Sequence, residues 1–344
     1  MKRWQFWVGL LISLALLYWS LGKLKLTDVV ATLESADYLW LLPGILVYMV
    51  AVWARAWRWH YLLRPLKKIP TNTMFPIVAI GYMGNNIYPA RAGEVLRAIV
   101  LKRREGVSIS ASLATIIVER IFDAVVMLGF VFLNLGELTR VTRGSGSAGI
   151  IELGVIGQIT IQDLAIGGAV IFLGALAVFI LAAMFPLVTE RVVNWAIDHL
   201  APERFRQKTR DVSQKFMGGL ESLRSPQEAL MVLLTSTVIW LLETGKYWFV
   251  MHAFHFQVSF FALMLMNGVV NLATTLPSAP GYIGTFDGPG IAVLQLYGVP
   301  GPIAAGYTLV LHAALWLPIT LLGAYYFLRE GYKWGEIPQV EKAS

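Results

Sequence analysis

Three charged residues lie inside the mostly apolar stretch 81–104, which reads GYMGNNIYPARAGEVLRAIVLKRR and ends in three more basic residues. Arg91, Glu94 and Arg97 follow one another at intervals of three, so on a helix they would lie along one side. A guanidinium group binds two phosphate oxygens at once through two parallel hydrogen bonds, and the N-terminus of a broken helix also favours an anion. We therefore expect a phosphate-binding site here, in which Glu94 orients the arginines or binds a cationic headgroup. The alternative is a loop whose arginines meet lipid headgroups. The breaks in the stretch are Asn85 and Asn86, which are further candidate headgroup ligands, and Pro89 and Gly93.

A second group of charges lies on a later apolar segment. Glu119 and Asp123 are four residues apart and would share one helix face, whereas Arg120 would point to another side. We expect the two carboxylates to pair with Arg91 or Arg97 rather than to exchange protons. The structural alternative is a buried charge network that locks helix packing. All three residues of the group are candidate headgroup-binding residues.

A second interrupted stretch, 258–297, contains the run TLPSAPGYIGTFDGPG. Asp287 lies where a second half-helix would begin, and it either caps that helix or contacts the ligand. Glu243 and Lys246, three residues apart in the preceding segment, can neutralise each other or form an ion-coupling pair. We expect His312 to be a packed histidine, with a proton carrier as the alternative. The residues that break this stretch are Pro277, Pro280, Gly281 and Gly284.

The composition indicates which elements position these residues. Of 344 residues, 57% are hydrophobic and 14% are charged, whereas soluble domains carry roughly 25% charged residues. Several apolar runs reach the ~20 residues that cross a bilayer. We predict an all-α polytopic integral membrane protein, with 1–344 as a single transmembrane domain. The net charge of +7 is explained by basic cytoplasmic loops and does not require nucleic acid. The chain has no Cys, and its His spacing shows no metal motif, so we expect neither a metal nor a cofactor.

The two interrupted stretches are predicted to be re-entrant helical hairpins between full spans. The rival arrangement has eight simple spans. In the predicted second span, Arg55 and Arg58 would be interface anchors that snorkel. Residues 137–160 would be a polar loop. The six predicted full spans cover about 4–21, 38–63, 110–136, 164–186, 227–251 and 302–328.

The order of spans and hairpins is the same in 1–136 and in 161–329. Basic residues place both termini in the cytoplasm, so the two halves would have opposite orientations. Matched interrupted segments in the two halves are typical of an inverted-repeat transporter with its site between the repeats. The intervening segment 187–225 is basic and is predicted to form cytoplasmic amphipathic helices near the bilayer, or else a solvated loop. We expect a multi-pass protein of the cytoplasmic membrane.

Three motifs in this order carry a family resemblance: NNIYPARAGEVLR, then ERIFD at 119–123, then PSAPGYIGTFD at 277–287. They resemble the lysylphosphatidylglycerol synthase transmembrane family over nearly the whole chain. The resemblance implies a flippase-like membrane domain that moves lipids between leaflets. Two departures, Tyr282 in place of a second Gly and Asp287 in place of Glu, put the second hairpin's substrate contact in doubt. The resemblance implies these site residues: Asn86, Pro89, Arg91, Gly93, Glu94, Arg97, Glu119, Arg120, Asp123, Pro280, Gly281 and Gly284.

These features together predict a lipid translocase for a phospholipid or a polyprenyl-phosphate-linked lipid. Arg91 and Arg97 would hold the phosphate. Only a short polar tail follows the last span, so we do not expect the family's aminoacyl-transferase domain or its activity. The alternatives are an intramembrane lipid-modifying enzyme, such as a phosphatase or headgroup transferase, and a non-catalytic scaffold. Expected partners are membrane lipids and a lipid-synthesising enzyme or glycosyltransferase, with no nucleic acid. The oligomeric state stays open.

Overall fold

The computed structural model describes residues 3–22, 24–88, 91–144, 150–152, 158–160, 184–200, 202–219, 225–275 and 278–332, with a few further positions between 167 and 181. The elements are α1 (Arg3–Leu21), α2 (Leu26–Glu34), η1 (Tyr38–Trp40), α3 (Leu41–Leu63), α4 (Thr71–Ile87), α5 (Ala92–Glu105), α6 (Ile109–Gly144), β1 (Ile150–Glu152), β2 (Gln158–Thr160), α8 (Pro186–Leu200), α9 (Glu203–Gly219), α10 (Pro226–Met251), α11 (Phe260–Ala273), η4 (Pro280–Tyr282), α12 (Asp287–Leu296) and α13 (Gly301–Arg329).

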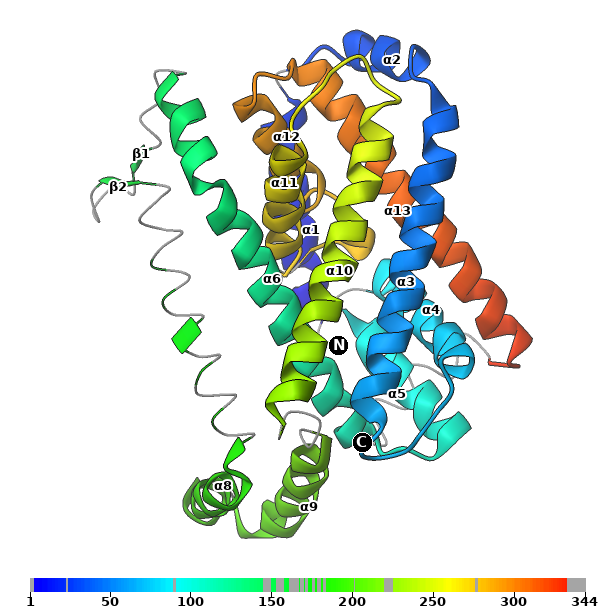
Figure 1. Ribbon diagram of the computed structural model, residues 1–344, viewed down its shortest axis with the longest axis vertical. Coiled ribbons are helices and arrows are strands. Elements are labelled where there is room, and N and C mark those ends of the chain that lie inside the picture. The colour runs from blue at the N-terminus through cyan, green and yellow to red at the C-terminus, as the bar shows by residue number, and fades with distance from the viewer. Residues whose placement is uncertain are drawn as a thin grey trace.

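The described chain is a helical bundle (Figure 1), which confirms the predicted all-α polytopic membrane protein. Among the described residues, three helices are long and apolar enough to cross a membrane: Tyr38–Leu63, Gln227–Met251 and Gly301–Arg329. Their bounds match the spans expected from the sequence. Most of the predicted span 164–186 lies outside the described residues.

The prediction of a polar loop over 137–160 is wrong for residues 137–144, which are helical. Helix α6 continues to Gly144, because residues 137–143 include neither Pro nor Gly that would end it. Strands β1 and β2 then form a small antiparallel pair, with Ile150 opposite Thr160. The charged site residues Glu119, Arg120 and Asp123 therefore lie on one long, continuous helix.

The helices of the two interrupted stretches are short. Helices α4 and α5 have 17 and 14 residues, and α11 and α12 have 14 and 10. At 1.5 Å per residue even the longest of them is about 25 Å. This is less than the ~30 Å hydrocarbon core. Helix α4 packs on α5, and α11 packs on α12. Short paired helices favour re-entrant hairpins over eight simple spans.

The helix contacts follow a two-fold pattern. Helices α3, α4, α5 and α6 correspond, in this order, to α10, α11, α12 and α13, and corresponding helices make equivalent contacts. Helix α4 packs on α13, as α11 packs on α6. Helix α5 packs on α6, as α12 packs on α13. Helices α3 and α10, which correspond to each other, pack together. In Figure 1 the pair α4–α5 lies toward the lower end of the bundle and α11–α12 toward the upper end. The inverted repeat with halves 1–136 and 161–329 stays a prediction, and this pattern supports it.

Glycines allow the two helices of the first hairpin to approach closely. A Cβ atom built on Gly93 would lie 1.9 Å from the carbonyl oxygen of Gly81, and one on Gly84 would lie 2.7 Å from the Cα atom of Gly93. Small residues at such a crossing let backbones touch within a membrane. Gly93 is therefore required by packing, whatever its part in binding.

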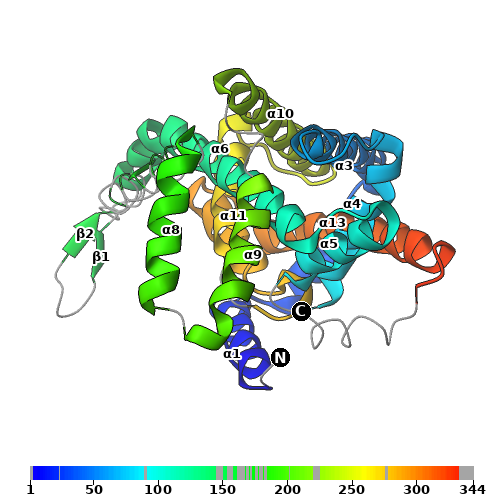
Figure 2. The ribbon, with the colours of Figure 1, turned by 90° about the horizontal axis from the view of Figure 1, so that it is seen from below.

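The segment 187–225 forms helices α8 and α9, which pack against each other at one end of the bundle (Figure 2). An ion pair between Arg210 and Asp198 joins them. Helix α8 exposes Leu187, Val192 and Trp195. Helix α9 contacts α6. Their placement at the bilayer surface stays a prediction.

Candidate functional site

Arg55 and Arg58 of α3 are buried in the bundle, with 4% and 1% of their surface exposed. The prediction that they snorkel to the interface is wrong. Acidic residues on neighbouring helices supply their counter-charges, and a buried charge requires such a partner. The side chain of Arg55 donates to Glu243 on α10 across 2.6 Å.

Asp123 is the centre of a network that joins three helices. Its Oδ1 atom accepts from Nη1 of Arg58 at 2.6 Å and from the Trp240 indole at 2.9 Å. Nη1 of Arg58 also donates to the Ser236 hydroxyl at 2.6 Å. These bonds tie α3, α6 and α10 together. Arg120 does not point away, as we had expected, because its Nη2 atom lies 3.5 Å from Oδ2 of Asp123.

Arg97 belongs to the same buried network. Its Nη2 atom donates to Oε2 of Glu119 at 2.6 Å, which confirms the predicted pairing of that carboxylate with an arginine of the first hairpin. The Arg97 guanidinium also lies over the Trp59 ring, 4.6 Å from its centroid. Glu119 in turn lies 3.5 Å from Nε of Arg58. The charge of Arg97 is thus already neutralised within the protein.

Arg91 differs from the other arginines. It lies just before α5 with φ 54°, in the left-handed region, so the prediction that it shares a helix side with Glu94 and Arg97 is wrong. Its Nη2 atom donates weakly to the backbone and side-chain oxygens of Thr274, at 3.3 and 3.4 Å. Its Nε atom is buried without a hydrogen-bond partner, which is also true of Arg55, Arg58, Arg97 and Arg120. Within the described part of the chain, no carboxylate pairs with it.

Tyr282 occupies the equivalent break of the second hairpin. With Arg91 it is one of two described non-glycine residues with positive φ, at 61°. The Arg91 guanidinium lies 5.9 Å from the centroid of the Tyr282 ring. Such backbone conformations cost about 1–3 kcal/mol each and gather at functional sites. The two strained residues, one from each hairpin, thus meet at a single contact.

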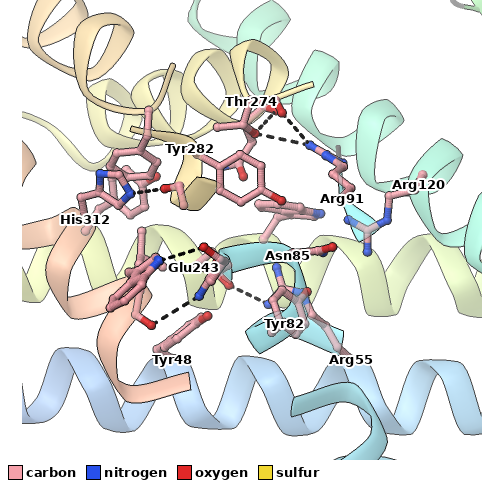
Figure 3. Close-up of a pocket in the computed structure, with 18 residues that line it drawn as sticks. Tyr48, Arg55, Tyr82, Asn85, Arg91, Arg120, Glu243, Thr274, Tyr282 and His312 are labelled. Carbon is pink, nitrogen blue, oxygen red and sulfur yellow. Dashed lines mark hydrogen bonds and ion pairs between the residues drawn. The ribbon is translucent and has the colours of Figure 1, made fainter. Parts of the chain in front are cut away.

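This contact borders a cavity of about 120 Å³ between the two hairpins, α3 and α10 (Figure 3). In Figure 3, Arg91 and Tyr282 lie on one side of the cavity, and Tyr48, Arg55 and Glu243 on the other. The lining residues are Tyr48, Arg55, Tyr82, Asn85, Asn86, Arg91, Arg120, Trp240, Glu243, Tyr247, Asn271, Thr274, Gly281, Tyr282, Phe286, His312, Leu315 and Trp316.

The charges around the cavity do not balance. Glu243 accepts from both Lys246 and Arg55, which confirms the predicted pair and adds a third member. Two cations thus share one anion. Apart from His312 and Asp287, which pair with each other, six basic and four acidic side chains join the cavity and its networks, which leaves two positive charges in excess. They are Arg55, Arg58, Arg91, Arg97, Arg120 and Lys246, against Glu94, Glu119, Asp123 and Glu243.

The structure divides the predicted site residues into groups. Asn85, Asn86, Arg91, Arg120, Glu243 and Gly281 line the cavity. Gly93, Glu94 and Arg97 line a small adjoining space that also reaches Asn85 and Arg120. Glu119, Asp123 and Lys246 support the cavity from buried positions, and Asp287 begins α12 as predicted. Pro280 begins η4, and Gly284 has φ 82°. Pro89 and Pro277 lie outside the described residues.

Sequence reasoning missed Arg55 and Arg58 as part of the site. Three acidic residues in other apolar spans needed buried partners, and two arginines three residues apart within α3 were available. Among the described residues, no group of three or more acidic or His side chains gathers in a way that would hold a metal ion.

Comparison with known families decides the identity at family level. The profile of the "Lysylphosphatidylglycerol synthase TM region" matches residues 6–323. The chain belongs to this family. The motifs 85–97, 119–123 and 277–287 all fall within the match, and they form the first hairpin, α6 and the second break.

Three relatives resemble this chain of the lysylphosphatidylglycerol synthase TM family over nearly its full length. A UPF0104 membrane protein of Methanothermobacter thermautotrophicus is 24% identical, over 95% of this chain and 93% of its own. A UPF0104 membrane protein of Pyrococcus horikoshii is 23% identical, over 94% and 95%. The "Glycosyltransferase AglD" of Haloferax volcanii is 25% identical over 92% of this chain, but over only 52% of its own length.

Proposed function

We propose that this protein is a lipid translocase of the cytoplasmic membrane, which places a phosphate-bearing headgroup in the cavity between its hairpins. The observation that carries the proposal is Arg91. Its guanidinium borders the cavity and pairs with no carboxylate among the described residues, whereas Arg55, Arg58, Arg97 and Arg120 each do; its Nε atom is buried without a hydrogen-bond partner, as theirs are. A buried polar group of this kind is costly unless a ligand satisfies it.

The charge excess supports a phosphate ligand. The surplus positive charge complements an anionic phosphate: a phosphodiester, such as a phospholipid or a sugar-linked polyprenyl phosphate, carries one negative charge, and a phosphate monoester carries up to about two. Arg91 and Arg120 would contact the phosphate. Arg97, which we first assigned this role, instead neutralises Glu119. A cavity of about 120 Å³ has room for a headgroup but not for acyl chains, which would extend into the bilayer.

The two-fold pattern of helix contacts supports alternating access. In inverted-repeat transporters the site lies between repeats that rock against each other. Here the cavity lies between hairpins that belong to the two proposed halves, and the strained contact of Arg91 with Tyr282 would be made and broken as the halves move. We place both termini in the cytoplasm from the distribution of basic residues.

A polyprenyl-phosphate-linked lipid is the substrate class we favour. The relative AglD is named a glycosyltransferase, and the chain aligns with about half of it. Attachment of this kind of membrane domain to a glycosyltransferase suggests a lipid that carries a sugar. The aromatic and amide side chains that line the cavity, such as Tyr48, Trp240 and Asn271, suit a sugar next to a phosphate. A separate glycosyltransferase would then be a partner of this chain.

Proteoliposomes test the proposal directly. Purified protein is reconstituted with labelled phospholipids and a labelled polyprenyl phosphate, and the label that reaches the inner leaflet is measured. Wild type should move one phosphate-bearing class, Arg91→Ala should lose this movement, and Arg91→Lys should retain part of it. Lys102→Ala, an exposed basic residue on α5, is the matched control and should behave as wild type. Absence of movement for every lipid, in protein shown to be folded, would refute the proposal.

A further inference from the structure

His312 of α13 lies between two acceptors at the second hairpin. Its Nε2 atom lies 2.7 Å from the carbonyl oxygen of Gly281 in η4, and its Nδ1 atom lies 2.8 Å from Oδ1 of Asp287, the first residue of α12. The imidazole thus links η4, at the break of the second hairpin, to α12, the half-helix that follows it. Neither contact was expected from the sequence, which suggested a merely packed histidine.

The hydrogen bonds determine where the protons are. A carbonyl oxygen only accepts, so Nε2 must carry a proton. Oδ2 of Asp287 accepts the backbone N–H of Gly284 at 2.9 Å, and the helix N-terminus at which this residue lies favours a negative charge. An ionised Asp287 can only accept, so in that state Nδ1 donates to it and both ring nitrogens carry a proton. The Phe286 ring, with its centroid 4.5 Å from that of the imidazole, adds a face that favours a cation.

The His312–Asp287 pair is connected to the headgroup cavity. His312 and Gly281 both line the cavity, and Gly281 precedes Tyr282, whose ring lies under the Arg91 guanidinium. Gly281 has φ 73°, and a Cβ atom there would lie 2.8 Å from the Trp316 indole nitrogen. A neutral imidazole has a single N–H and can satisfy only one of its two acceptors. Loss of one proton would therefore release either the break or α12 from α13.

No other described acidic group competes for this histidine. Helix α11 has no ionisable residue, α1 approaches Gly284 with Ser13, and α2 packs on α13 further along, at Gly306. Glu243 is already held by Arg55 and Lys246. The ionisable groups that the surrounding elements present to the cavity, besides Arg91 and Arg120, are Tyr48 and Arg55 of α3, Tyr82 of α4, Glu243 and Tyr247 of α10, and Tyr282 of η4.

We propose that His312 and Asp287 form a proton-binding pair that locks the second hairpin break against α13, and that this proton is released and rebound in each transport cycle. Headgroup movement is then coupled to one proton per lipid. The inference rests on the proposed function and adds its energy source. The proton leaves Nδ1 or Nε2 for bulk solvent, and the carboxylate of Asp287 stays ionised throughout.

Two measurements on reconstituted full-length protein test this coupling. The first is the steady-state ratio of a labelled lipid between leaflets under an imposed pH gradient, with the membrane potential clamped to zero. One-to-one coupling gives a ratio of about tenfold per pH unit in wild type. His312→Gln keeps hydrogen-bonding capacity but does not titrate, so whatever lipid this variant moves should reach equal leaflets under the gradient. His252→Gln, at the end of α10, should match wild type.

The second measurement does not depend on transport. Nitrogen NMR of 15N-histidine-labelled protein in lipid reads the protonation of each ring, and the His312 signal is the one missing from His312→Gln. We expect both nitrogens of His312 to be protonated at a pH where the other histidines are neutral.

The outcomes separate the two proposals. Lipid exchange in wild type with equal leaflets under a gradient would overturn the coupling and leave the translocase standing. Absence of lipid movement would overturn the translocase and the coupling together, and the NMR result would still decide the proton site. A neutral His312 at pH 7 would overturn the proton-binding pair in either case.

Discussion

Neutralising Asp123 should destabilise the protein by an amount that its neighbours determine. The Asp123→Asn variant leaves the guanidinium of Arg58, with 1% of its surface exposed, without its main partner. Breaking a buried pair from one side costs about 3–5 kcal/mol. Glu119 remains 3.5 Å from Nε of Arg58, and Asn can still accept from the Trp240 indole. We therefore expect the lower end of the range, about 3 kcal/mol.

A double-mutant cycle in lipid nanodiscs measures this loss as a change in unfolding free energy. Arg58→Met should cost about as much as Asp123→Asn, and the two together should cost at least about 2 kcal/mol less than their sum. Lys67 is the control, because its pair with Glu105 at 2.9 Å is surface-exposed and worth at most about 1 kcal/mol. A single-variant loss at Asp123 no larger than that at Lys67, or additive effects in the cycle, would refute the buried network.

Further predictions concern the hairpins and the second network. Gly93→Ala places a Cβ atom 1.9 Å from an α4 carbonyl oxygen and should strongly lower the folded yield and the melting temperature. Gly129→Ala, at a position that faces open space, is the control and should change neither. Equal melting temperatures of the two variants would contradict this packing. Glu243→Gln leaves the buried cations Arg55 and Lys246 without their common counter-ion and should lower the unfolding free energy by about 3 kcal/mol in the same nanodisc assay. A loss below about 1 kcal/mol would argue against the shared anion. Single cysteines at Glu105 and Gly298, in a chain that has no other Cys, should be labelled from opposite sides of the membrane; labelling of both from one side would exclude the inverted repeat.

Much of the fold could be predicted from hydropathy, because span length and apolar runs depend on the bilayer and not on tertiary contacts. The bounds of α3, α10 and α13 are examples. Asp287 as the start of α12 followed from the preceding Gly and Pro residues. The C-terminal end of α6 could not be placed, because a charged helix that leaves the membrane has the composition of a loop.

The partners of the charges were harder to predict. Helical spacing indicates which residues share a face, and it led us to pair Glu119 with an arginine of the first hairpin, as found with Arg97. It gives no information on which helix packs opposite, so Arg58 was missed as the partner of Asp123. Arg91 was misplaced because helical spacing assumes a helical backbone. Its positive φ puts it outside α5, so it does not share a helix face with Glu94 and Arg97.

Access to the cavity from both sides of the membrane tests the central claim most directly. Asn271 lines the cavity, so Asn271→Cys provides a single thiol there in a chain without other cysteines. Membrane-impermeant thiol reagents are applied to each side of oriented vesicles, with and without the lipid class that is moved. The account predicts labelling from both sides, slowed by that lipid in either case. Labelling from one side alone, under every condition of lipid and pH, would contradict a translocase.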